Sequence, residues 1–279
     1  MESLKFTIRI DDIPDHPDPT ESKNLAAVLE KHRAPATVAI CSGWLRDWPA
    51  HQPIYRKLYD EGLLDIACHG MYHEDFGDVG EVGMYGEKLH YFRPLTLADT
   101  DLVLKECQAF ARSFFGKEYT MFVTPGSNVA EDLLPKDVFT FYQILHINGF
   151  RSVSHYPGPS GADPLIKAFK RTEHIFEVPF TIYVDFWRRG HFVNNFVPED
   201  YEKYVEATKD HIKTRYKFGL YVNLFIHLFN FRNDPDPRAG FQGNNPGGKF
   251  LDEILTWTKE NYPGVEFVGM EDLIGPDKQ

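Results

Sequence analysis

Cysteines, clusters of basic residues and long apolar segments are scarce in this sequence of 279 residues. Cys41, Cys68 and Cys107 are odd in number, far apart and beside apolar residues, which is typical of buried reduced thiols and not of a disulfide framework. A formal net charge of −11 without a Lys or Arg cluster excludes broad binding to nucleic-acid phosphates. No apolar segment is long enough to cross a bilayer, and residues 4–8 have the pattern of a strand, not of a signal peptide. We therefore expect a cytoplasmic protein without a membrane span.

Internal repeats and low-complexity tracts are also absent, and 42% hydrophobic residues suffice for a sizeable core. Strand and helix patterns alternate along the chain, which favours an α/β fold in a single domain of residues 1–279. Strands are expected at residues 4–10, 37–40, 119–123, 150–154, 175–180, 182–187, 220–227 and 265–268, with another ending at 68. Helices are expected at residues 20–33, 52–61, 97–115, 138–148, 199–217 and 250–261.

Two adjacent carboxylates, Asp11 and Asp12, follow the alternating apolar residues of the first strand. Asp12 has the opposite parity to Asp11, so both reach one site only if the strand ends or bulges there. The turn signal at Ile13-Pro14 makes such an ending plausible. One carboxylate can then bind a metal ion while the other acts as a base.

His69 and His73 are four positions apart, so both imidazoles reach one ion if the backbone enters a helical turn. Taken alone, such a pair is more typical of surface or hydrogen-bonded histidines. Together with one carboxylate of the first strand, it completes a set of two histidines and one carboxylate that leaves a position for water.

Residues 42–49 are expected to form a loop with two indoles, where Trp44 either stacks on a sugar or packs as a lid. Residues 74–95 suggest a long insertion over the site. In the strand 220–227 the aliphatic side chains share one face, and Tyr221, Asn223, Phe225 and His227 share the other. This split suits a barrel whose interior opens into a site at the carboxyl end, with His227 at its rim.

Five segments in this order resemble the motifs of the polysaccharide deacetylases, the NodB-homology carbohydrate esterases. They are Ile10-Asp11-Asp12, His69-Gly70-Met71-Tyr72-His73, Thr124-Pro125-Gly126, Asp185-Phe186-Trp187 and Leu224-Phe225-Ile226-His227. The resemblance implies a distorted seven-stranded (β/α) barrel, similar to a TIM barrel. It also implies a divalent metal, usually Zn²⁺, and removal of an N-acetyl group from an amino sugar.

The resemblance further implies that Asp12, His69 and His73 bind the metal, Asp11 is the general base and His227 the general acid. The chemistry agrees, because the ion would polarise the amide carbonyl and lower the pKa of its water toward ~7. An amide nitrogen is a poor leaving group without a proton, so a second proton carrier is needed.

The third motif departs from the family, which usually places an Arg shortly before the Pro. Arg9 shares strand parity with Asp11 and could replace that Arg by pairing with Asp185, or could form a simple salt bridge at the barrel floor. On the resemblance alone, Pro125, Gly126 and Ser127 would line the substrate site, where backbone N–H groups help to hold the oxyanion. Trp44 and Trp187 are expected to contact the substrate.

A small-molecule or oligosaccharide substrate is expected, and an intracellular sugar or glycoconjugate precursor fits better than chitin or peptidoglycan. Three alternatives stay open. The first is hydrolysis of another C–N bond, such as a formamide or a cyclic amide. The second is a metal-free glycosidase that uses Asp11 and Asp185, and the third is a non-catalytic carbohydrate-binding relative. The sequence does not decide whether the protein forms a homo-oligomer.

Overall fold

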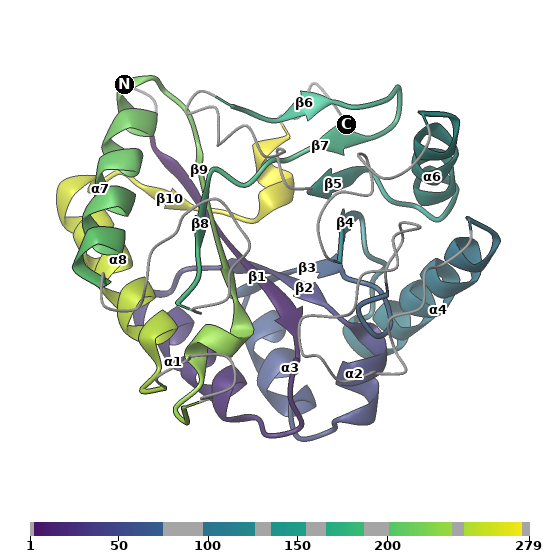
Figure 1. The fold of residues 1–279 in the computed structure, drawn as a ribbon, viewed down its shortest axis with the longest axis horizontal. Helices are drawn as coiled ribbons and strands as arrows, with labels where there is room; N and C mark the ends of the chain where they lie inside the picture. Colours follow the sequence, from purple (N-terminus) through teal and green to yellow (C-terminus); the bar gives the residue numbers. More distant parts are fainter. Residues whose placement is uncertain are drawn as a thin grey trace.

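A curved, mostly parallel sheet runs through the centre of the molecule, and helices surround it (Figure 1). The computed structural model describes residues 3–74, 97–125, 135–154, 166–186, 201–235 and 243–274. Its strands are β1 (Lys5–Ile13), β2 (Ala36–Ile40), β3 (Leu64–Cys68), β4 (Met121–Val123), β5 (Ser152–Ser154), β6 (Phe169–Lys170), β7 (Phe176–Glu177), β8 (Ile182–Val184), β9 (Val222–His227) and β10 (Glu266–Phe267).

The helices lie around the outside of the sheet (Figure 1). In Figure 1, α1 (Thr20–His32), α2 (Ser42–Asp47) and α3 (Gln52–Asp60) lie below the sheet. On the right are α4 (Leu97–Phe115) and α6 (Pro135–Ile147), and on the left α7 (Tyr201–Lys217) and α8 (Pro246–Asn261). Two short 3₁₀ helices, η2 (Leu228–Phe231) and η3 (Met270–Leu273), follow β9 and β10.

The strand order is β6-β7-β5-β4-β3-β2-β1-β9-β8, with β10 beside β1, and every described pair except β6–β7 is parallel. This mixed α/β arrangement confirms the fold class predicted from the sequence, a distorted barrel. The resemblance implied a seven-stranded barrel and the residue patterns indicated nine strands, whereas the described part of the chain has ten in one sheet. The strand that the patterns missed is β6, whose two residues are too few to leave a periodic pattern.

Among the described strands β1 has the most partners, since it pairs with β2, β9 and β10. Its register places Asp11 opposite His227 of β9. The pairing with β2 is irregular between Ile10 and Ile13, and Asp12 has a φ of 62°. The expected bulge is therefore present, and it lets two successive carboxylates lie near one site at the carboxyl end of the strand.

Two local predictions were wrong. Residues 42–47, expected to be a loop, form the short helix α2. The segment from His69 to His73 is a non-helical turn in which Gly70 has a φ of 80° and His73 a φ of 59°. In both cases contacts with distant residues decide the backbone, and local pattern does not show them.

Part of the sequence interpretation falls outside the described residues: nearly all of the expected insertion at 74–95, and Gly126, Ser127 and Trp187. Within the described ranges, no helix is both long and apolar enough to span a membrane.

Candidate metal centre

Asp12, His69 and His73 bring three metal-ligating atoms together at the carboxyl ends of β1 and β3, and these atoms all lie within 4.8 Å of one another. The Nε2 atoms of both histidines are 3.2 Å from Oδ1 of Asp12. One carboxylate oxygen and two imidazole nitrogens suit Zn²⁺ and related divalent ions, and a three-ligand set leaves room for water or substrate. The donor set therefore fits the metal that the sequence suggested.

The ring orientation of His69 is fixed from β4. Its Nδ1 is 2.8 Å from the carbonyl oxygen of Val123, which only accepts, so Nδ1 carries the proton and donates it. Nε2 then faces Asp12 with its lone pair available to a metal ion. Such a hydrogen bond behind a histidine ligand fixes its tautomer and orientation.

His73 is held by an aromatic stack. Its ring lies parallel to Trp44, with centroids 6.2 Å apart, and Trp48 stacks on Trp44 at 5.7 Å. Trp44 therefore contacts the site through the His73 ring. A sugar-stacking role for Trp44 stays a prediction.

Neighbouring charges set the protonation of this cluster. Burial favours the neutral form of Asp12, but the nearby His73 and His69 outweigh it and hold the pKa of Asp12 well below its usual range. Burial likewise opposes a charge on His73, but the contact with Asp12 raises the pKa of that imidazole. The cluster thus favours an ionised Asp12, which suits a cation, whereas His73 must release its proton when an ion binds.

Asp11, beside Asp12, forms an ion pair with Arg9. Arg9 donates from Nε to Oδ1 at 2.8 Å and from Nη2 to Oδ2 at 2.5 Å, and both side chains are only 4% exposed. A third nitrogen of the same guanidinium donates to Oγ of Ser154 at 2.9 Å. Arg9 therefore holds Asp11 in one orientation.

The sequence suggested that Arg9 pairs with Asp185, but among the described contacts its carboxylate partner is Asp11. The guanidinium lies over the ring of Phe225, 4.3 Å from its centroid. The same-side parity of Arg9 and Asp11 on β1 was the correct signal, since residues two apart on a strand project to one face.

His227 reaches the centre from β9. Its Nε2 is 3.9 Å from Oδ2 of Asp12, and its ring stacks on Phe229 with centroids 4.9 Å apart. Behind it, Nδ1 is 3.5 Å from the hydroxyl of Tyr183, which donates to Oδ2 of Asp185 at 2.6 Å. Tyr183 donates its hydroxyl proton to Asp185. In the contact with His227 its oxygen is therefore the acceptor, and Nδ1–H of His227 is the donor.

Comparison with known proteins points to one family. Residues 5–138 match the family model for polysaccharide deacetylase, and this stretch includes Asp11, Asp12, His69 and His73. Over these residues the chain is similar to the polysaccharide deacetylase family. No curated protein matches the sequence.

Solved structures with the same fold include polysaccharide deacetylases and their relatives. A probable polysaccharide deacetylase from Pseudomonas aeruginosa PAO1 is 13% identical, with 97% of this chain and 89% of that chain covered and a TM-score of 0.61. A family 4 acetyl xylan esterase from Clostridium thermocellum with a cobalt ion is 14% identical, with 97% and 90% covered and a TM-score of 0.53. A family 4 pseudoenzyme from Bacillus anthracis is 10% identical, with 97% and 65% covered and a TM-score of 0.51. At these identities the likeness shows the fold alone.

In this polysaccharide deacetylase relative, the structure therefore brings together Asp11, Asp12, His69, His73, His227 and Arg9, and places Asp185 behind His227 through Tyr183. Pro125 is buried just after β4. The sequence interpretation missed Tyr183 and Ser154. Tyr183 could have been found, because it is two residues before Asp185 on a strand and so projects to the same side.

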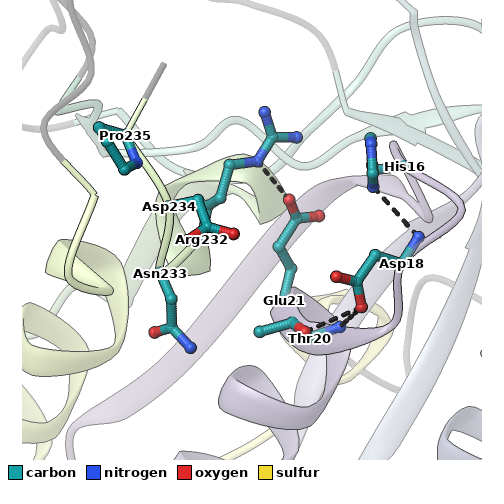
Figure 2. A pocket seen from close by; sticks show the side chains of 8 residues that line it. All are labelled: His16, Asp18, Thr20, Glu21, Arg232, Asn233, Asp234 and Pro235. Carbon is teal, nitrogen blue, oxygen red and sulfur yellow. Dashed lines mark hydrogen bonds and ion pairs between the residues drawn. The ribbon is translucent and has the colours of Figure 1, made fainter. Parts of the chain in front are cut away.

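A polar cavity of about 200 Å³ lies between the loop after β1 and the segment after η2. Two of the residues that line it, Glu21 and Arg232, point toward each other (Figure 2). Nε of Arg232 donates to Oε1 of Glu21 at 2.5 Å. Its lining is His16, Asp18, Thr20, Glu21, Arg232, Asn233, Asp234 and Pro235. Asp15 is close by, with Oδ2 3.7 Å from Nη2 of Arg232. Burial, followed by the charge of Glu21, raises the pKa of Asp15 well above its usual range.

Proposed function

We propose that this chain is a metal-dependent hydrolase that removes an N-acetyl group from an amino sugar or glycoconjugate precursor. One observation carries the proposal: Asp12 contacts the histidine pair on one side and faces His227 on the other, while Asp11 lies next to it on β1. Amide hydrolysis needs an electrophilic centre, a base for water and an acid for the leaving nitrogen. The residues that would supply these three functions lie close together here.

Asp12, His69 and His73 would hold the metal, and Zn²⁺ suits these ligands best. When bound, such an ion polarises a carbonyl and acidifies water.

Asp11 would accept the proton of the attacking water. Arg9 binds both of its oxygens, but each carboxylate oxygen has a further lone-pair direction for a proton. The buried guanidinium thereby fixes the direction in which Asp11 accepts, and it does for the base what the missing Arg of the third motif does elsewhere in the family.

His227 would donate a proton to the departing amine. Its Nδ1 faces the phenol oxygen of Tyr183, and its Nε2 faces the Asp12 side of the centre. The ring can therefore carry a proton toward the reacting atoms, while Tyr183 and Asp185 hold its other edge. Burial, and then Asp185, raise the pKa of Tyr183 well above its usual range, so the phenol keeps its own proton.

The test is acetate release by purified protein loaded with Zn²⁺ or Co²⁺. The substrates are N-acetylated sugars and sugar nucleotides, with O-acetylated xylan and simple formamides as comparisons. The proposal expects N-acetyl substrates to be preferred and a chelator to abolish turnover. Because a relative with this fold is a pseudoenzyme, a metal-loaded protein that releases no acetate from any of them would contradict the proposal.

A further inference from the structure

The turn that carries both histidine ligands has an unusual backbone. Between His69 and His73 it passes through Gly70 at a φ of 80°, and it reaches His73 at a φ of 59°. The left-handed region is unfavourable for a residue with a Cβ. His73 keeps this conformation only if neighbouring groups hold the turn, and two sets of contacts do so.

The first set holds the carbonyl groups of the turn. The N–H of Ser42 donates to the carbonyl of Gly70 at 2.9 Å, and the N–H of Gly43 donates to that of Met71 at 2.7 Å. These donors open α2, and the first N–H groups of a helix have no partner within it. The contact is close: a Cβ on Gly43 would lie 2.6 Å from the Tyr72 ring.

The second set holds the N–H groups of the turn, and it comes from one side chain. Glu74 accepts from the N–H of Met71 with Oε2 at 2.8 Å and from the N–H of Tyr72 with Oε1 at 3.1 Å. The residue is 7% exposed, so water cannot readily replace these bonds. Both carboxylate oxygens are committed to the backbone that leads into His73.

We propose that Glu74 is a positioning residue of the metal centre, whose carboxylate keeps His73 in its metal-binding conformation. The inference rests on the proposed metal-dependent function. Glu74 does not belong to the ligand group, which within the described residues is Asp12, His69 and His73. It acts through the backbone: without it, two successive N–H groups lose their acceptor, and the left-handed turn loses the support on that side.

The experiment measures Co²⁺ binding to the metal-free protein without substrate, from the visible absorption of the ion and by competition with a chelator. Glu74→Gln leaves one acceptor oxygen and turns an amide NH₂ toward a backbone N–H. Glu74→Ala leaves no acceptor. We expect Co²⁺ affinity to fall about 10-fold to 100-fold in Glu74→Gln, as for other groups that orient metal ligands, and further in Glu74→Ala.

Glu177→Gln is the matched control, because Glu177 is a buried carboxylate, 2% exposed, on β7. Thermal melting of the metal-free proteins shows that each variant is folded. Glu177→Gln should bind Co²⁺ as the wild type does, with the same absorption spectrum, whatever it loses in stability. A folded Glu74→Gln or Glu74→Ala that binds Co²⁺ as tightly as the wild type would overturn the positioning role.

The two proposals fail in different ways. A wild type that binds Co²⁺ but hydrolyses no acetylated substrate, together with weak binding by the Glu74 variants, overturns the hydrolase and supports the positioning role. A wild type that binds no Co²⁺ contradicts the metal centre itself.

Discussion

Two aspartates near the end of β1, Asp12 and Asp15, have pKa values shifted in opposite directions although their side chains are almost equally exposed, at 10% and 8%. The pKa of Asp12 is held well below its usual range, and that of Asp15 is raised well above it. Burial raises the pKa of both carboxyl groups, so burial does not explain why their pKa values differ. Asp12 faces His69 and His73, whereas Asp15 faces Glu21 with Arg232 at the edge.

The comparison shows that the partner side chains decide what a buried carboxylate does. Imidazoles make Asp12 an ionised oxygen with two nitrogens beside it, which suits a cation. A neighbouring carboxylate favours the protonated form of Asp15. A proton shared with Glu21 gives one oxygen of each carboxyl group a partner, where Oδ1 and Oδ2 of Asp15 and Oε2 of Glu21 have no other described hydrogen bond. The same residue type, three positions apart, therefore gives a metal ligand and a proton-sharing pair.

The largest effect should separate these two aspartates directly. Asp12→Asn removes the ionised ligand, so we expect bound Zn²⁺ to be lost and turnover to fall by ~10³-fold or more, since a catalytic metal supplies several kcal/mol. Asp15→Asn should keep the metal and most of the activity. Elemental analysis and acetate release measure both, and equal metal loss in the two variants would contradict the distinction.

Asp11→Asn should keep the metal and lose turnover by ~10²-fold to 10⁴-fold, because Asp11 is the base and not a ligand. Metal content and acetate release on the same preparation test this. Turnover at the wild-type rate would remove Asp11 from the role of base.

His227→Ala should slow the hydrolysis of amides by ~10²-fold or more and that of activated esters much less, because an activated leaving group needs little protonation. The measurement is the ratio of the two rates in wild type and variant. An equal loss on both substrates would argue against His227 as the acid.

Arg9→Met should lower the free energy of unfolding by about 3–5 kcal/mol, because it leaves Asp11 buried without its partner. Denaturant unfolding measures it. The double variant Arg9→Met with Asp11→Leu should recover part of the loss, and a single variant as stable as the wild type would show that the ion pair contributes little.

The smallest effect concerns pH. Because the folded pKa of Asp15 is raised, its contribution to stability is complete below the unfolded value of ~3.9 and decreases as pH rises through the folded value. Glu21→Gln removes the neighbouring negative charge, so the decrease in unfolding free energy above about pH 4 should become shallower. The exposed Glu206→Gln should leave this slope unchanged. An unchanged slope in Glu21→Gln would contradict a proton-sharing pair.

Much of this site could be predicted from the sequence, because its residues lie at strand ends and strand periodicity is readable. The bulge at Asp12 followed from parity and the nearby Pro14, and the grouping of Asp12 with His69 and His73 followed from the motifs. Location in the cell stays a prediction.

What could not be predicted depends on contacts between distant segments. Residues 42–47 form a helix whose first N–H groups donate to the carbonyl groups of residues 70–71. The local sequence pattern does not predict these hydrogen bonds. Arg9 pairs with Asp11 because both project from one face of β1 beneath Phe225, whereas Asp185 is engaged by Tyr183. The role of Glu74 could not be predicted from the sequence, because its partners are backbone N–H groups.

The most direct test of the account is a crystal structure of the protein grown with Zn²⁺, read from the anomalous signal of the ion. We predict one strong peak about 2.0–2.2 Å from a carboxylate oxygen of Asp12 and from Nε2 of His69 and His73, with none at Asp15 and Glu21. A peak at the Asp15 pair, or an empty Asp12 site at saturating Zn²⁺, would contradict it.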